Sequence, residues 1–336
     1  MKRSLLTSVL LTVLVCIVSL VCIAMGGSSI PKAFSSFVKG IAGSPYALAE
    51  VLVRATPLIF AALGVSIGFR TGFLNIGAEG QLYMGAIAIT AVGLKCSFLP
   101  SFLLVPLVLA AGFLAGGLWA LFPGFLKAKF GLSEVINTIM LNYIAINVVG
   151  ILVRTFLKDP TYPYPMSPML PSFLSFPLLL PPTRLHAGFL LALISALLVY
   201  LLMFRTATGF CMRAVGFNSR ASLCSGISVG KQVLLSSLLS GGLAGLAGVS
   251  EIAGLHHRLL EGISPSYGYI AIVVALLGRN HPLYIIIASC LIAALQVGSM
   301  AMQRASGVPT SIASIIMGLV VVMLLIQQQL LRQKEI

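Results

Sequence analysis

Long apolar runs follow one another along almost the whole chain, separated by prolines, glycines or basic residues. A straight helix needs about 20 apolar residues to cross the hydrocarbon core of a membrane. The pattern therefore predicts an all-α polytopic membrane protein of about 10 helices in a single domain, residues 1–336. The predicted spans are residues 5–25, 47–69, 72–94, 101–122, 135–157, 188–204, 231–253, 266–278, 282–302 and 310–330.

Three of these runs differ from simple spans. Residues 72–94 contain polar side chains and several glycines, and residues 266–278 are too few to cross as a straight helix. Both predict broken or re-entrant segments. Residues 5–25 follow basic residues as in a signal peptide, but about 20 apolar residues exceed the usual 7–15 of such a peptide, so we expect an uncleaved span.

Composition agrees with a membrane location. Hydrophobic residues make up 59% of the chain, charged residues make up 8%, and the mean hydropathy is +1.08. An ordinary soluble domain is about 25% charged. A chain this apolar would also collapse in water, which excludes a disordered protein.

The few charges are mostly basic, with 21 Lys and Arg against 7 Asp and Glu. The basic residues are scattered singly between apolar runs, so they do not indicate a nucleic-acid partner. Residues 205–231 hold four basic and no acidic side chains, and basic loops tend to stay on the cytoplasmic side. We therefore place the loop 205–230 and both termini in the cytoplasm.

Residues 159–187 form a proline-rich segment that ends in Pro181-Pro182. Dense prolines favour extended backbone without helices. The predicted topology places this loop on the extracytoplasmic face, where a passive connector and a docking surface are both open interpretations.

The strongest candidate chemistry lies early in residues 72–94, where Asn75, Glu79 and Gln81 fall in a glycine-rich stretch. Polar groups within a membrane are costly and mark functional sites by default. Glycines weaken a helix and allow close backbone approach. These side chains either line a polar path or form a hydrogen-bonded structural cluster that locks helices together, and the sequence favours neither.

Asn137, Asn142 and Asn147 recur at steps of five in the fifth predicted span. A step of five turns a helix by about 140° beyond a full turn, so at most two of them can face one cavity. We select Asn137 and Asn142 as candidates for the polar path. Glu50 and Arg54 lie one turn apart and are expected to pair with each other.

Motifs for catalysis are lacking. Gly226 to Lys231 resembles a phosphate-binding loop but has three intervening residues instead of four, and Gln232 stands where Ser or Thr would bind magnesium. The six cysteines show no C-x-x-C spacing and no Cys/His cluster, so we expect no bound metal and no cofactor. Helix-packing faces are expected at two motifs of small residues, Gly112-x-x-x-Gly116 and Gly241-x-x-x-Gly245.

Four blocks of sequence carry a resemblance to a known family: Gly68–Gln81, Gly131–Ala145, Arg213–Ile227, and Ser264–Gly268 with Ala271–Asn280. They resemble the membrane permease subunits of bacterial ABC importers, in the branched-chain amino acid/ribose/nucleoside branch. The second block is particularly similar to the nucleoside-type members.

This resemblance implies a fold like that of type II ABC importers, a place in the bacterial inner membrane and a set of partners. A cytoplasmic ATPase would bind ATP and Mg²⁺, and a second permease chain, alike or distinct, would complete the pathway. An extracytoplasmic binding lipoprotein would deliver a small-molecule substrate, and membrane lipid would surround the spans. The segment that the resemblance implies as the ATPase contact includes Arg213, Gly216, Asn218, Arg220, Ala221 and Gly226.

Two departures from the family pattern bear on function. Ser222-Leu-Cys replaces a common Ala followed by Arg-Tyr, which changes the details of the ATPase contact. Tyr269-Ile270 stands where many members have Phe and a polar residue. That change favours a flatter, less polar ligand than a simple sugar, such as a purine nucleoside or riboflavin. A simple-sugar permease and an ion-coupled secondary transporter using Glu79 are the alternatives.

Overall fold

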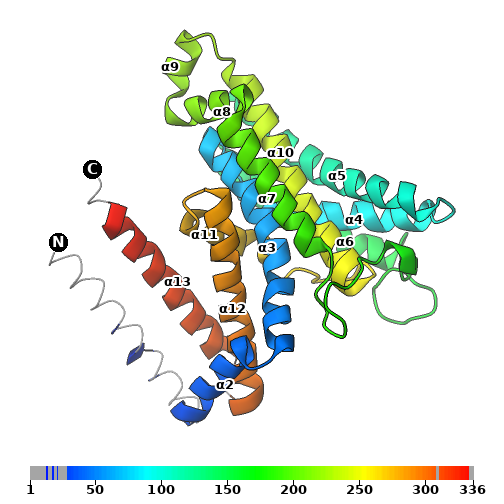
Figure 1. Ribbon diagram of the computed structural model, residues 1–336. Coiled ribbons are helices and arrows are strands. Elements are labelled where there is room, and N and C mark those ends of the chain that lie inside the picture. Colours follow the sequence, from blue (N-terminus) through cyan, green and yellow to red (C-terminus); the bar gives the residue numbers. More distant parts are fainter. Residues whose placement is uncertain (1–12, 14–16, 19–20, 22–28, 308–309, 333–336) are drawn as a thin grey trace. The chain divides into compact units, whose positions relative to one another are not determined.

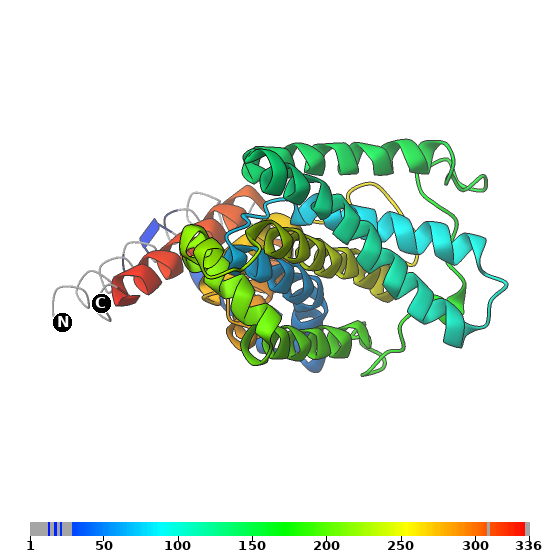
Figure 2. The same ribbon diagram turned by 90° about the horizontal axis from the view of Figure 1, so that it is seen from above.

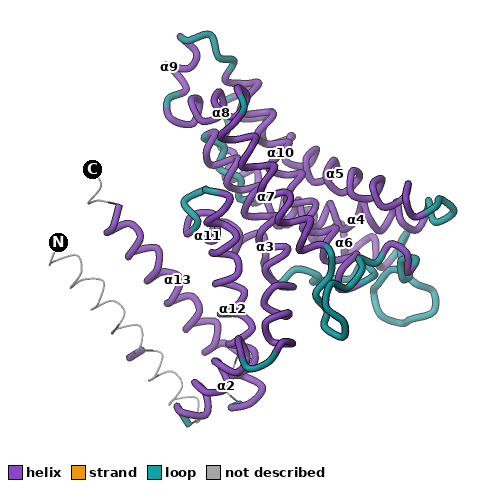
Figure 3. The backbone as a smooth tube through the Cα atoms, viewed as in Figure 1, coloured by secondary structure: helices purple, strands orange, loops and turns teal. Residues whose placement is uncertain are grey.

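The computed structural model describes residues 13, 17, 18, 21, 29–307 and 310–332. Over these residues the secondary structure is helical, with two isolated β-bridges (Figures 1 and 3). The helices are α2 (Ile30–Ala42), α3 (Pro45–Thr71), α4 (Ala78–Lys95), α5 (Ser101–Phe130), α6 (Glu134–Arg154), α7 (Gly188–Arg205), α8 (Ala207–Phe217), α9 (Ser219–Cys224), α10 (Val229–Glu251), α11 (Tyr267–Leu277), α12 (Pro282–Ser306) and α13 (Thr310–Arg332).

Among the described residues, six helices are long and apolar enough to cross a membrane, namely α3, α5, α6, α7, α10 and α12. Helix α10 continues into a π-helical turn at Ile252–His256. The all-helical, multi-pass fold is therefore confirmed. Helices α4, α11 and α13 also coincide with predicted spans. The first predicted span, residues 5–25, lies almost entirely outside the described residues.

Helix α2 and the end of helix α5 differ from the sequence prediction. Helix α2 was not predicted, because its apolar residues recur on one face instead of forming a continuous run. Helix α5 continues to Phe130 rather than ending near residue 122. Its last turn carries Lys127, whose charge pairs with Glu134. The same turn carries Lys129, whose long apolar stem can extend a span while its charged end reaches water.

The described chain divides into two compact units. Residues 55–289 form the larger unit, in which α10 packs against α4 and α5, and these two helices also pack against each other (Figure 2). Helix α6 lies against α4 and α5, and α7 lies against α8. In the smaller unit, Ala33 and Phe37 of α2 pack with Met302 of α12.

Glycines set the close approach of α4, α5 and α10. A Cβ atom on Gly245 of α10 would collide with the carbonyl oxygen of Gly112 on α5, and one on Gly116 would collide with the carbonyl oxygen of Gly241. Both small-residue motifs are therefore confirmed as packing faces. Such contacts bring backbones together where larger side chains would hold them apart.

The proline-rich segment lacks α-helix, as its composition predicts, and consists of irregular backbone with turns, bends and one 3₁₀ turn at Ser172–Leu174. It is fixed by backbone hydrogen bonds to the chain that follows α10. The N–H groups of Ser167, Leu170 and Phe176 donate to the carbonyls of Leu259, His257 and Ala253, at 2.8 to 2.9 Å.

His186 closes this segment as a buried neutral ring. Its side chain is 2% exposed, its Nδ1 accepts a hydrogen bond from the Gly188 N–H at 3.2 Å, and its ring lies 5.9 Å from that of Phe176. Burial, with a smaller effect from His257, lowers the pKa of His186 to about 4. The folded protein therefore holds this histidine uncharged at neutral pH.

The glycine contact predicts a position-specific effect of a single methyl group. Gly245→Ala should lower the free energy of unfolding by roughly 1–3 kcal/mol, because overpacking forces backbones apart. Gly230→Ala is the matched control in the same helix, since its Cβ would meet only Ala128 at 3.9 Å. It should stabilise by up to about 1 kcal/mol through helix propensity. Thermal unfolding in detergent compares the two, and equal effects would contradict the packing described.

The buried histidine predicts acid sensitivity. The unfolded chain takes up a proton on this side chain below pH ~6.5, whereas the folded chain does so only near pH 4, so folding stability falls across that window. At pH 5 the loss is about 2 kcal/mol at roughly 1.4 kcal/mol per pH unit. His186→Gln removes this titration, so its unfolding midpoint should fall less than the wild-type midpoint between pH 7.5 and pH 5. Parallel pH profiles would refute the assignment.

Candidate functional site

The candidate site is built on a non-helical loop, Gly72–Gly77, between α3 and α4. Helix α3 ends because Gly72 adopts a φ of +80°, a conformation that suits a residue without a side chain. The Phe73 N–H then donates back to the Gly68 carbonyl at 2.9 Å. Most of the loop is buried, so its polar groups need partners inside the protein.

Asn75 and Gln81 satisfy one another across this loop. The Asn75 amide nitrogen donates to the Gln81 carbonyl oxygen at 2.8 Å, and the Gln81 amide nitrogen donates to Asn75 Oδ1 at 2.9 Å. Asn75 Oδ1 also accepts the Gly77 N–H, and the Asn75 amide donates to the hydroxyl of Ser240 on α10. Both amides are buried, at 0% and 1% exposed.

Glu79 connects the first turn of α4 to the start of α11. Its Oε2 accepts a hydrogen bond from the Gly268 N–H at 2.7 Å, and its carboxylate is also hydrogen-bonded by the Ser264 side chain. A Cβ atom on Gly268 would collide with the backbone of Glu79. A carboxylate beside the first amides of a helix is stabilised by the helix dipole, so this contact fixes where α11 begins.

Asn142 connects the same region to α6. Its Oδ1 accepts the Gly80 N–H at 2.8 Å, and its amide nitrogen donates to the Ile76 carbonyl at 2.9 Å and to the Tyr269 hydroxyl at 3.2 Å. Asn142 is 0% exposed, while Tyr269 is half-buried. A single amide thus holds the loop, α4 and α11 together.

An ion pair holds the other end of the loop. Lys127 of α5 pairs with Glu134 at the start of α6 and also donates to the Gly72 carbonyl. Glu134 Oε1 accepts the Leu74 N–H at 3.1 Å. Sequence reasoning missed Lys127, Glu134 and Ser240 because each lies far from the loop in the chain and only the fold brings them together.

The loop cluster (Asn75, Glu79, Gln81, Asn142, Ser240 and Tyr269) therefore joins α4, α6, α10 and α11. The geometry brings together four of the five residues selected for a polar path. Asn137 is half-buried on α6, and within the described chain no side-chain hydrogen bond attaches it to this cluster. Most of the donors and acceptors of the cluster are matched within the protein.

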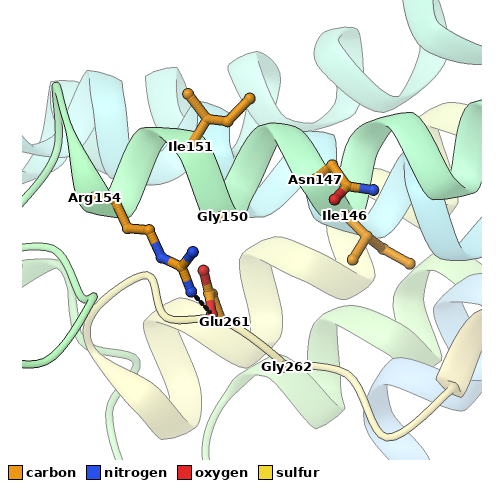
Figure 4. A pocket seen from close by; sticks show the side chains of 7 residues that line it. All are labelled: Ile146, Asn147, Gly150, Ile151, Arg154, Glu261 and Gly262. Atoms are coloured by element: carbon orange, nitrogen blue, oxygen red, sulfur yellow. Dashed lines mark hydrogen bonds and ion pairs between the residues drawn. The ribbon is translucent and has the colours of Figure 1, made fainter.

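A second polar feature lies at the far end of α6 (Figure 4). A cavity of about 340 Å³ is lined there by Asn147, Gly150, Arg154 and Glu261 among others. The side chains of Arg154 and Glu261 point toward each other and form an ion pair at 3.1 Å. Asn142 thus lies at the loop cluster and Asn147 at this cavity, as their spacing predicts.

The predicted ATPase-contact segment folds into the short helices α8 and α9 (Figure 1). Helix α8 begins at Ala207 and α9 begins at Ser219. The start of α8 is fixed by Thr206, whose hydroxyl caps the helix by accepting the Gly209 N–H at 3.1 Å. Asn218 caps α9 in the same way, through the Ala221 N–H at 3.0 Å.

Residues of this segment differ in what they can contact. Asn218, Arg220 and Ala221 are exposed on or beside α9, and Gly226 ends the segment with a φ of +81°. Gly216 instead seats α8 on the end of α3, because a Cβ there would collide with the Arg70 carbonyl oxygen.

Two exposed apolar side chains lie within the segment and were not selected from the sequence. Phe217 is 89% exposed and Leu223 is 65% exposed. Phe217 ends α8 and Leu223 lies within α9. Both are large apolar residues in a basic, polar segment, and that contrast is a signal that the sequence offers.

Comparison with known proteins places the chain among transport proteins. It is 36% identical over 306 residues to the guanosine ABC transporter permease protein NupP of Bacillus subtilis, covering 88% of this chain and 86% of that one. It is 37% identical over 295 residues to the glucose ABC transporter permease protein TsgB13 of Haloferax volcanii, covering 84% and 77%.

The nucleoside ABC transporter permease protein NupB of Lactococcus lactis is 32% identical over 285 residues, covering 82% of this chain and 78% of that protein. No solved structure matches the chain. Residues 47–325 match the family described as branched-chain amino acid transport system / permease component. The resemblance of the four sequence blocks is thereby confirmed, and the chain belongs to this family of membrane permeases.

Proposed function

We propose that this chain is the permease subunit of an ATP-driven importer that moves a nucleoside across the bacterial inner membrane. The observation that carries the proposal is the similarity to a guanosine permease and a nucleoside permease over more than four fifths of the chain. The family match runs without interruption over residues 47–325, which supports treating residues 1–336 as one permease domain.

The half-buried ring of Tyr269 supports a ligand with a flat aromatic base. Its hydroxyl is held by Asn142, which fixes the ring while leaving part of it accessible. Aromatic rings stack on flat π-systems, so a purine base or the ring system of riboflavin suits this position. A simple sugar is the second candidate, and the 37% identity to a glucose permease favours it.

We propose that α8 and α9 form the contact with a cytoplasmic ATPase, which binds ATP and Mg²⁺. This assignment places loop 205–230 and both termini in the cytoplasm. The exposed Arg220 offers a charge for an acidic partner, and the exposed Phe217 and Leu223 offer apolar anchors on either side of it. Gly216 seats this element against α3, so movement of the ATPase would be transmitted to the loop cluster.

The remaining partners are proposed from the family. A second permease subunit would complete the pathway, and an extracytoplasmic lipoprotein would deliver the substrate at the proline-rich face. The fixed backbone of residues 159–187 supports a docking surface over a passive connector, because a preformed surface loses little conformational freedom on binding. The cavity beside Arg154 and Glu261 lies next to that segment, since Arg154 and Lys158 also border Pro163 and Pro165.

We propose that the loop cluster is a scaffold beside the pathway. Asn75 and Gln81 use their amide groups on each other and on the backbone. Glu79 is engaged by Gly268 and Ser264. The half-buried Tyr269 and Asn137 have surface left to face a substrate.

Transport can be tested directly in vesicles. The chain, co-expressed with a cytoplasmic ABC ATPase and a partner permease of this family, should take up guanosine only when ATP is supplied. Arg220→Glu should reduce co-purification of the ATPase by about tenfold or more if this charge contacts the partner, since losing a charged hydrogen bond costs about 1.5–3 kcal/mol. Lys95→Glu, on the end of α4 remote in sequence from α8 and α9, is the control.

Two results would contradict this function. Uptake driven by an ion gradient without any ATPase would indicate a secondary transporter. Preference for glucose over guanosine by the complete assembly would replace the nucleoside with a sugar while keeping the permease assignment.

A pair of substitutions at Glu79 separates a structural from a pathway role. Glu79→Gln keeps an oxygen that can accept the Gly268 N–H, so the variant should fold and retain uptake within about threefold, a change under 1 kcal/mol. Glu79→Ala leaves that N–H unpaired in a buried site and should cost about 1–3 kcal/mol of folding stability. Size-exclusion profiles and initial uptake rates give both readouts. A folded Glu79→Gln protein without uptake would show that the charge itself is needed.

A further inference from the structure

Two arginines share one aromatic ring at the boundary where α3 and α7 end. Arg70 lies in the last turn of α3, and its guanidinium carbon is 4.8 Å from the ring centre of Phe204 in the last turn of α7. The guanidinium carbon of Arg213, on α8, is 5.2 Å from the same ring centre. Each contact is a cation–π interaction, yet together they bring two positive charges close to each other.

His281 completes this group, which we name the double-arginine site (Arg70, Arg213, Phe204 and His281). The His281 ring lies 5.1 Å from that of Phe204, and its Nδ1 is buried without a hydrogen-bond partner. The rings of Tyr200 and Tyr284 also lie against the histidine ring, edge-on and tilted respectively, at 5.8 and 4.9 Å between ring centres.

The protein supplies little to balance these charges. Arg70 Nε donates to the Asn280 carbonyl at 2.6 Å, a neutral acceptor. One terminal nitrogen of Arg213 is buried and lacks a hydrogen-bond partner. No ion pair in the described chain involves either arginine, and Glu134, the acidic residue bonded to the loop after α3, is paired with Lys127. Residues 160–250 and 262–334 contain no Asp or Glu.

Such an arrangement is costly without an anion. Burying a guanidinium nitrogen without a partner carries a desolvation penalty, and two like charges on one ring repel each other. A phosphate group would give the buried nitrogen an acceptor and would offset the repulsion between the two arginines. Guanidinium groups bind phosphate oxygens through paired hydrogen bonds.

The surroundings distinguish a lipid phosphate from a dissolved one. Helices α3 and α7 are both candidate membrane spans, so their ends lie at the level of the lipid headgroups. Tyrosines are enriched at that level, and Tyr284 is exposed beside the site. The apolar surface that acyl chains would cover continues from the site along α7 and the first turns of α12, at Leu197, Leu198, Leu201, Leu283 and Ile287.

We propose that the double-arginine site binds the phosphate group of an anionic phospholipid, with Arg213 as the principal ligand and Arg70 as the second. The acyl chains lie against the exposed leucines of α7 and the start of α12. Because Arg70 is also the residue against which Gly216 seats α8, the lipid would brace the junction between α3 and the α8–α9 element.

The test uses the purified full-length chain in mild detergent and measures the unfolding midpoint during titration with lipid. Dioleoyl phosphatidylglycerol should raise the midpoint, whereas dioleoyl phosphatidylcholine with the same acyl chains should not. Arg213→Gln should weaken the apparent affinity for phosphatidylglycerol about tenfold, the expected loss for one charged hydrogen bond. This variant spares Arg70, whose backbone contacts make its replacement a risk to folding.

Lys129→Gln is the matched control. Lys129 also contacts aromatic rings, those of Phe125 and Phe130, both at 5.5 Å, but it has no second cation on the same ring. It should change the affinity for phosphatidylglycerol by less than twofold. Equal stabilisation by both lipids, equal weakening by both variants, or equal protection by inorganic phosphate would each overturn the proposal.

Discussion

A buried loop without helical hydrogen bonds is the constraint on which the larger unit depends. Residues Gly72–Gly77 interrupt the passage from α3 to α4, and buried backbone groups that lack helical partners must find others nearby. The protein meets this requirement with side chains from α5, α6 and α10, namely Lys127, Glu134, Asn142 and Ser240. Each bond that satisfies the loop also positions a helix, so the loop cluster determines how these helices meet.

The same loop lies between the element proposed for the ATPase contact and the helices proposed for the pathway. Gly216 of α8 sits on the Arg70 carbonyl, one residue before the end of α3. Beyond the loop, Glu79 holds the start of α11 and Asn142 holds Tyr269. Helices α5 and α10 are already in close backbone contact at their glycines, so they cannot move closer together. A short series of direct contacts therefore connects α8 to α11, along which a displacement of α8 would be passed on.

The sequence predicted the parts with a strong local signal and missed those made by tertiary contact. Apolar runs located α3, α6, α7, α10 and α12, and the glycine spacing identified the packing faces of α5 and α10. The polar cluster was found because polar residues are rare in such runs. Its partners Glu134 and Ser240 were not found, because each looks like an ordinary helix-end or helix-face residue until the fold brings it to the loop. Helix α2 was missed because its apolar face is discontinuous in sequence.

We expect the loop cluster to act as one cooperative unit, which a double-mutant cycle can measure. Asn75 lies within the loop and Asn142 lies on α6, and the two side chains share no hydrogen bond with each other. The measurement is the free energy of unfolding of Asn75→Ala, Asn142→Ala and the double variant. We expect the double variant to lose at least about 1 kcal/mol less than the sum of the single losses, because the first substitution already releases the loop. Losses that add within about 0.5 kcal/mol would show independent contacts and contradict the account.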